Sequence, residues 1–177
     1  IFFFFSPGLM QANPADVMRG EETQIAGALR LLPGYDGVLC LPGTHSKWAH
    51  ISAGEVVSFQ TFMTGELFAL LSTASVLRHG MQGSGWDDAA FDTAVDDALS
   101  RPERLGVRLF SLRAEGLIAG LTPDAARARL SGLLIGMERE RTPSAKAGLR
   151  TFALAALFGT LCAMLGVLSG GSWLVAV

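Results

Sequence analysis

One segment constrains the fold of this chain more than any other: Leu41-Pro42-Gly43-Thr44-His45-Ser46-Lys47-Trp48. Apolar runs precede and follow it, which predicts a strand that breaks at Pro-Gly and a second strand after it. Gly43 permits a tight turn with positive φ, and successive N–H groups in such a turn form a concavity that binds anions. The alternative is a plain polar connection. In the anion-binding interpretation, the hydroxyl groups of Thr44 and Ser46 would donate hydrogen bonds to a phosphate and Lys47 would add a positive charge. His45 lies among these residues.

Composition narrows the possible partners. At 177 residues the chain can form one domain with a sizeable core, and half of its residues are hydrophobic while 17% are charged. A net charge of −2 gives no indication of a strongly basic surface and argues against a nucleic-acid partner. Cys40 and Cys162 lie far apart, which fits a reducing compartment. The histidines have no metal-ligand spacing, so no metal ligand is assigned.

The first part of the chain predicts a mixed α/β structure. We expect a buried strand over 1–5, a strand over 37–41, and a hairpin of 48–52 and 55–61 around Ala53-Gly54. A helix is expected from Glu21 to the stop at Pro33-Gly34. Its apolar face consists of Ile25, Ala28, Leu29 and Leu32.

Helices are expected after the hairpin. Thr64 is predicted to cap a helix that runs from 65 or 66 to about 78, with Gly80 as its C-cap. Asp87 or Asp88 should cap a helix that runs to residue 99. Leucines at 105, 109 and 112 mark a third helix, and Thr122-Pro123-Asp124 is a strong start for a fourth.

A dense charged cluster lies beside glycine and proline turns, and it has two interpretations. It is either a solvated helix start or a strand-end loop that offers a carboxylate base and an arginine to an anionic substrate. Its members are Asp16, Arg19, Glu21 and Glu22.

The chain changes character at Met137. Charged residues over 138–141 are followed by a polar stretch, and 151–177 contains no charged residue. That apolar length exceeds the roughly 20 residues that span a bilayer, which predicts a membrane-like helix.

Three segments, 14–24, 40–48 and 59–68, together resemble the 2-dehydro-3-deoxygalactonokinase family, and the resemblance covers about 1–136. It implies an α/β fold of the actin, hexokinase and sugar-kinase superfamily, whose members have two RNase-H-like domains around a cleft. This chain would hold a partial RNase-H-like domain followed by helices. The implied reaction moves the γ-phosphate of ATP, with magnesium, to the 6-hydroxyl of 2-dehydro-3-deoxy-D-galactonate. The implied setting is galactonate catabolism in the bacterial cytoplasm.

The resemblance also implies residue roles. Asp16 would accept the proton of the sugar-acid hydroxyl, and Arg19 would pair with the substrate carboxylate or a phosphate oxygen. Glu21 or Glu22 would orient Arg19 or a magnesium-bound water, and Thr64 and Glu66 would contact substrate. The second phosphate loop would comprise Gly43, Thr44, His45, Ser46 and Lys47. The family's Asp-Trp-Gly-Thr-type ATP loop has no counterpart in this sequence, so we expect reduced or absent turnover.

The tail resembles a different family. Segments 132–141 and 148–154 are similar to the start of an MgtC-type membrane protein, which implies a join near the Gly-Leu-Leu-Ile-Gly string. The expected organisation is a kinase portion over 1–136, a charged and polar linker over 137–150, and a membrane-like tail over 151–177. Three functions stay open: a sugar-acid kinase, a membrane protein fragment, and a non-catalytic remnant that binds nucleotide or sugar acid. The oligomeric state is open as well.

Overall fold

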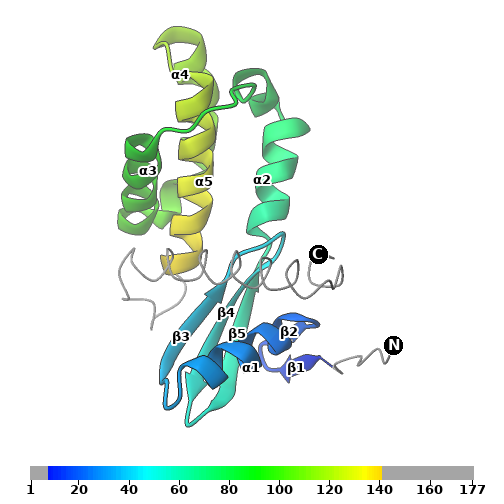
Figure 1. Ribbon diagram of the computed structural model, residues 1–177. Helices are drawn as coiled ribbons and strands as arrows, with labels where there is room; N and C mark the ends of the chain where they lie inside the picture. The colour runs from blue at the N-terminus through cyan, green and yellow to red at the C-terminus, as the bar shows by residue number, and fades with distance from the viewer. Residues whose placement is uncertain (1–7, 141–177) are drawn as a thin grey trace, which may run out of the picture. The chain divides into compact units, whose positions relative to one another are not determined.

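The computed structural model describes residues 8–140. The expected strand over 1–5, most of the linker and the tail over 151–177 lie outside these residues. The described chain forms two compact units, one that ends at Thr61 and one that begins at Phe62. The first unit contains the strands and one helix, and the second is helical (Figure 1).

The first unit opens with a short hairpin that the sequence did not predict. Strand β1 (Leu9–Ala12) pairs antiparallel with β2 (Ala15–Met18), and Gln11 lies opposite Asp16. The cluster around Asp16 was expected to be either a solvated helix start or a strand-end loop; Glu21 and Glu22 do begin a helix, but Asp16 lies within strand β2, which neither interpretation predicted. Strands of four residues are too short to display an alternating pattern, and the hairpin is held by contacts with a distant strand that are described below.

A three-stranded sheet and one helix complete this unit. Helix α1 (Glu21–Leu31) precedes β3 (Gly37–Leu41), β4 (Ser46–Ser52) and β5 (Glu55–Phe62), and the sheet order is β3-β4-β5. Ala53 and Gly54 both have positive φ (52° and 79°), as a type I′ hairpin turn requires, so the predicted hairpin is confirmed. The core comprises Met18, Ile25, Ala49, Ile51 and Phe59.

Two details of this unit differ from expectation. Leu32 was placed on the buried face of the helix, but α1 ends at Leu31 and Leu32 is 43% exposed. The expected loop over Thr44–Lys47 is shorter, because β4 already begins at Ser46 and Lys47 pairs with Leu41 of β3. Ser46 and Lys47 are therefore strand residues, and both are buried.

The second unit consists of α2 (Thr64–Thr73), the 3₁₀ turn η1 (Val76–Gly80), α3 (Asp88–Ser100), the 3₁₀ turn η2 (Pro102–Arg104), α4 (Leu105–Ile118) and α5 (Pro123–Glu140). The Asp87 carboxylate accepts the N–H of Ala90 at 2.9 Å, which confirms it as the cap of α3. The predicted helix to residue 78 was too long. It stops at Thr73 because the Ser75 hydroxyl accepts the N–H of Leu77 and starts a 3₁₀ turn.

Glycines in α5 allow it to pack closely on α3. A Cβ at Gly136 would lie 2.6 Å from Ala98 Cβ, and one at Gly132 would overlap the backbone oxygen of Phe91. These glycines bound the Gly-Leu-Leu-Ile-Gly string, so close helix packing accounts for both of them. Helix α5 continues to Glu140, four residues past the expected end of the kinase portion.

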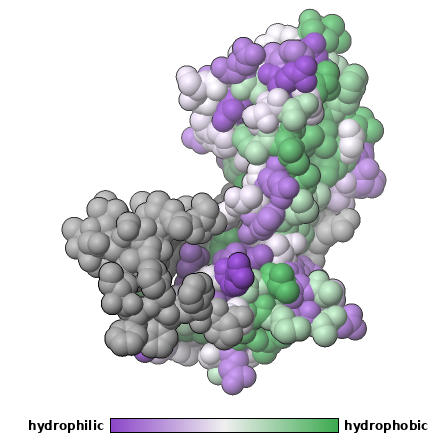
Figure 2. Space-filling model, turned by 90° about the vertical axis from the view of Figure 1, so that its right-hand side faces the viewer, coloured by the Kyte–Doolittle hydropathy of each residue, from purple (hydrophilic) through white to green (hydrophobic). Residues whose placement is uncertain are grey.

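The surface of the helical unit keeps large apolar side chains among its polar ones (Figure 2). Four in α4 are at least 60% exposed: Val107, Phe110, Leu117 and Ile118. Within residues 8–140, no helix combines the length and the apolarity that a bilayer crossing needs.

Candidate functional site

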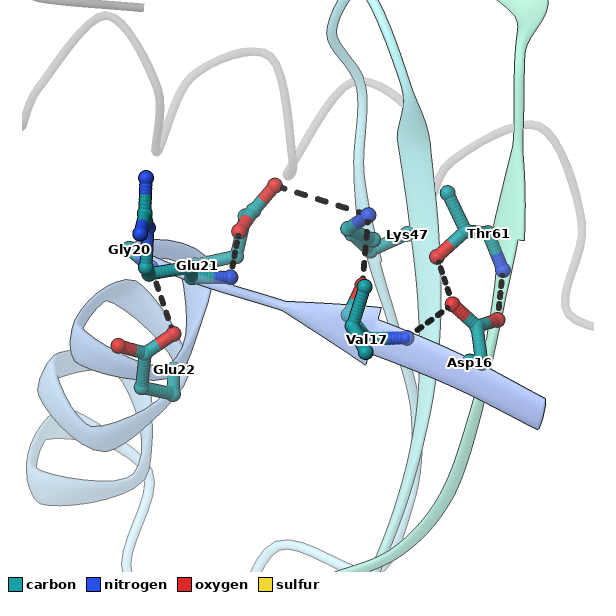
Figure 3. A network of polar contacts seen from close by, with 8 residues as sticks. Asp16, Val17, Gly20, Glu21, Glu22, Lys47 and Thr61 are labelled. Atoms are coloured by element: carbon teal, nitrogen blue, oxygen red, sulfur yellow. Dashed lines mark hydrogen bonds and ion pairs between the residues drawn. The ribbon is translucent and has the colours of Figure 1, made fainter. Parts of the chain in front are cut away.

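The turn from β2 into α1 is the centre of a polar network (Figure 3). Gly20 has φ 122°, a conformation that glycine adopts at little cost, and it lets the chain reverse between Met18 and Glu21. The Glu21 carboxylate accepts the N–H of Arg19 at 3.2 Å, and the Glu22 carboxylate accepts the N–H of Gly20 at 2.7 Å. Both carboxylates also lie at the positive end of the helix dipole. The two glutamates therefore fix the shape of this turn.

Lys47 reaches this turn from β4. Its ammonium donates to the carbonyl oxygen of Val17 at 3.2 Å and lies 3.9 Å from a Glu21 carboxylate oxygen. The side chain of Lys47 is 7% exposed and that of Glu21 is 27% exposed. A buried ammonium needs such partners to offset its lost hydration. Lys47 thus joins the sheet to the end of β2 and the start of α1.

Asp16 lies one residue before this junction, within β2. Its Oδ2 accepts the N–H of Thr61 at 2.7 Å, and its Oδ1 accepts the Thr61 hydroxyl at 2.6 Å and the N–H of Val17 at 2.7 Å. The carboxylate therefore links β2 to β5 (Figure 3). Thr61 was not singled out by the sequence, although it lies in one of the family-like segments.

The predicted site residues of the first unit fall into two groups. Gly43, Thr44 and His45 are exposed in the turn between β3 and β4, and Arg19 is exposed after β2. The network that the structure brings together is mostly shielded from solvent, and it contains Asp16, Glu21 and Lys47.

Thr64 and Glu66 belong to the helical unit, in the first turn of α2. Thr64 was predicted to cap this helix, but it is the first helical residue and its hydroxyl donates to the Glu138 carboxylate. Glu138 is 1% exposed, although the sequence placed it in a charged linker. Its spacing of four from Leu134 and eight from Leu130, both buried, is the signal that could have revealed this.

Across residues 8–140, no group of three or more histidine, cysteine, aspartate or glutamate side chains is arranged to hold a metal ion. The site offers hydrogen-bond donors and single charges, which suit an anionic substrate.

Comparisons with known proteins identify the family. The family model described as 2-keto-3-deoxy-galactonokinase matches residues 3–165. This range extends beyond residue 136 and includes both segments, 132–141 and 148–154, that were expected to resemble an MgtC-type protein. A Rhizobium meliloti (strain 1021) protein named "Probable 2-dehydro-3-deoxygalactonokinase DgoK1" is 43% identical over 137 residues. The Escherichia coli (strain K12) 2-dehydro-3-deoxygalactonokinase is 37% identical over 134 residues. Each match covers 75% of this chain and 45% of the relative.

A solved structure agrees with these matches. A crystal structure from Sinorhizobium meliloti, assigned as a 2-dehydro-3-deoxygalactonokinase protein, superposes with a TM-score of 0.75 at 39% identity. The superposition covers 80% of this chain and 49% of the crystallised chain, so this chain spans about half the length of the relatives that it matches. The α/β fold expected from the sequence is confirmed. This chain belongs to the 2-keto-3-deoxy-galactonokinase family.

Proposed function

We propose that this chain carries part of the catalytic apparatus of a sugar-acid kinase. The reaction is ATP-dependent phosphorylation of 2-dehydro-3-deoxy-D-galactonate at its 6-hydroxyl, in galactonate catabolism in the bacterial cytoplasm. One observation carries the proposal: the family-like segments 14–24 and 40–48 meet in space, where Lys47 contacts Val17 and Glu21. The names of the two relatives support the substrate class.

The exposed groups are the ones we propose to bind substrate. The exposed turn at Gly43, Thr44 and His45 would hold phosphate oxygens of ATP through its backbone N–H groups, although Gly43 does not have the positive φ expected from the sequence. ATP would enter as its magnesium complex. The exposed Arg19 guanidinium would pair with the carboxylate of the sugar acid, since its planar fork matches a carboxylate. Thr64, which is buried, and Glu66, which is half-buried, also remain proposed substrate contacts.

The buried groups would shape the site. Lys47 and Ser46 are shielded, so Lys47 would act by fixing Val17 and Glu21 and by adding positive charge behind the turn. Asp16 remains the proposed proton acceptor. Its three hydrogen bonds use three of the roughly four lone-pair positions of a carboxylate, which leaves one for a substrate hydroxyl. Phosphoryl transfer depends mainly on such positioning and on charge neutralisation.

The wider organisation is also a proposal. We infer that the sheet unit is part of an RNase-H-like domain, and that residues 1–136 form the kinase portion ahead of a linker and a membrane-like tail. The superposition on a family structure supports the first inference.

The direct test is a turnover and binding assay on the 177-residue chain. We expect ADP and a phosphorylated sugar acid to form at a reduced rate when 2-dehydro-3-deoxy-D-galactonate, ATP and magnesium are supplied, with loss of this turnover in Arg19→Met. Arg30→Met, an exposed arginine in the last turn of α1, is the matched control. Calorimetric binding of magnesium-ATP without turnover would favour the non-catalytic alternative. The absence of both magnesium-ATP binding and turnover would refute the proposal.

A further inference from the structure

We propose that Gln11, Asp16 and Thr61 form a clasp that positions the β2–α1 turn, which makes Gln11 and Thr61 positioning residues of the site. The proposal rests on the proposed function for its catalytic consequence. Its structural content stands on the hydrogen bonds alone.

The clasp acts on the free edge of a sheet. In the order β3-β4-β5, strand β5 lies at one edge, and its outward N–H groups need partners. Side chains supply them: Gln11 Oε1 accepts the N–H of Phe59 at 3.1 Å, and Asp16 Oδ2 accepts the N–H of Thr61 at 2.7 Å. Residues 59 and 61 are two apart, so both N–H groups point to the same side of the strand.

The two acceptors are matched to each other. Gln11 and Asp16 are direct partners across the β1–β2 pair, so the hairpin presents them side by side. The amide nitrogen of Gln11 donates to the Pro14 carbonyl at 2.8 Å, which holds its oxygen toward β5. The Thr61 hydroxyl adds a second bond to Asp16. One register of the hairpin on β5 satisfies all of these groups together.

The register of the hairpin on β5 determines the position of the end of β2 relative to the sheet. The Val17 carbonyl follows Asp16 directly and accepts from Lys47, and Arg19 and Glu21 come next in the chain. A slip of the hairpin along β5 would move the Val17 carbonyl away from the Lys47 ammonium and would shift the turn. The clasp therefore fixes the position of Arg19, the residue proposed to bind the sugar-acid carboxylate, relative to the sheet.

The structural test measures amide hydrogen exchange by NMR in the 177-residue chain. Thr61→Val removes the hydroxyl bond to Asp16, and Thr61→Ser retains it. We expect Thr61→Val to accelerate exchange at the Arg19 and Gly20 amides by about tenfold, and Thr61→Ser to stay within about twofold of the wild type. Thr93→Val is the matched control, because the Thr93 hydroxyl bonds Ala89 within α3.

The functional readout is the Michaelis constant for each substrate. Thr61→Val should raise KM for the sugar acid by about tenfold and leave KM for ATP within about twofold, with rescue by Thr61→Ser. Gln11→Ala, which removes the acceptor for Phe59, should act in the same direction and replaces Thr61→Val if that variant does not fold. Unchanged exchange at Arg19 and Gly20 in the folded variant would overturn the clasp. Absent turnover in every variant would count against the proposed function, and the exchange data would still decide the clasp.

Discussion

At the scale of single residues, the ion pair between Glu115 of α4 and Arg129 of α5 makes stability depend on pH. The Arg129 guanidinium donates to Glu115, and this hydrogen bond lowers the pKa of the Glu115 carboxyl; burial opposes the shift and the arginine charge adds to it. A lowered folded-state pKa means that the stabilisation is present above the unfolded pKa and is lost as pH falls through the folded one.

The corresponding prediction concerns Arg129→Met. We expect it to reduce the free energy of unfolding near neutral pH by less than about 1 kcal/mol, because the Glu115 side chain is 38% exposed and solvent screens the pair. The difference from the wild type should shrink in strongly acidic solution, where Glu115 is protonated. Urea titrations across this pH range measure it. A difference that grew toward acid would contradict the assignment.

Lys47 gives a second prediction at this scale. Lys47→Met keeps the apolar stem of this buried side chain but leaves the Val17 carbonyl without its donor and Glu21 without its cation. We expect a loss of about 1–3 kcal/mol in the free energy of unfolding, measured by urea denaturation. Arg30→Met removes an exposed charge in the same unit and should change stability little. Equal effects of the two substitutions would show that Lys47 is not anchored as described.

At the scale of elements, the close α3–α5 contact should reverse the usual effect of replacing a helical glycine by alanine. Gly→Ala within a helix normally stabilises by up to about 1 kcal/mol. At Gly136 the added Cβ would lie 2.6 Å from Ala98 Cβ, so we expect Gly136→Ala to destabilise the chain by about 1–3 kcal/mol. Gly116→Ala in α4 is the control, since nothing lies within 4 Å of its added Cβ. Thermal unfolding of both variants tests the predicted opposite signs.

The elements also show what the sequence could and could not predict. The Ala53-Gly54 turn and the Asp87 cap depend on local chemistry, and both were predicted correctly. The β1–β2 hairpin and the burial of Lys47 were not predicted. Their stabilising partners are distant in sequence: Asp16 bonds a residue 45 positions away, and Lys47 bonds one 30 positions away. Periodicity and capping rules contain no information about such pairs.

At the scale of the whole molecule, each compact unit has a hydrophobic core of its own. Ile51 is fully buried in the core of the sheet unit, and Leu130 is fully buried in that of the helical unit. The candidate network of Asp16, Glu21 and Lys47 depends on the first core, because Met18 and Ile25 belong to it and lie in β2 and α1. Integrity of this network should therefore follow the stability of the sheet unit.

This dependence is testable with one large-to-small substitution in each core. Ile51→Ala and Leu130→Ala should each cost about 2–5 kcal/mol of local stability. In hydrogen exchange, Ile51→Ala should reduce protection most in 8–61, including Arg19 and Gly20, and Leu130→Ala should reduce it most in 62–138. Leu31→Ala, at a position 64% exposed, is the control. If Leu130→Ala loosened the β2–α1 turn as much as Ile51→Ala did, the site would depend on the helical core as well, and the assignment of the turn to the sheet unit alone would be wrong.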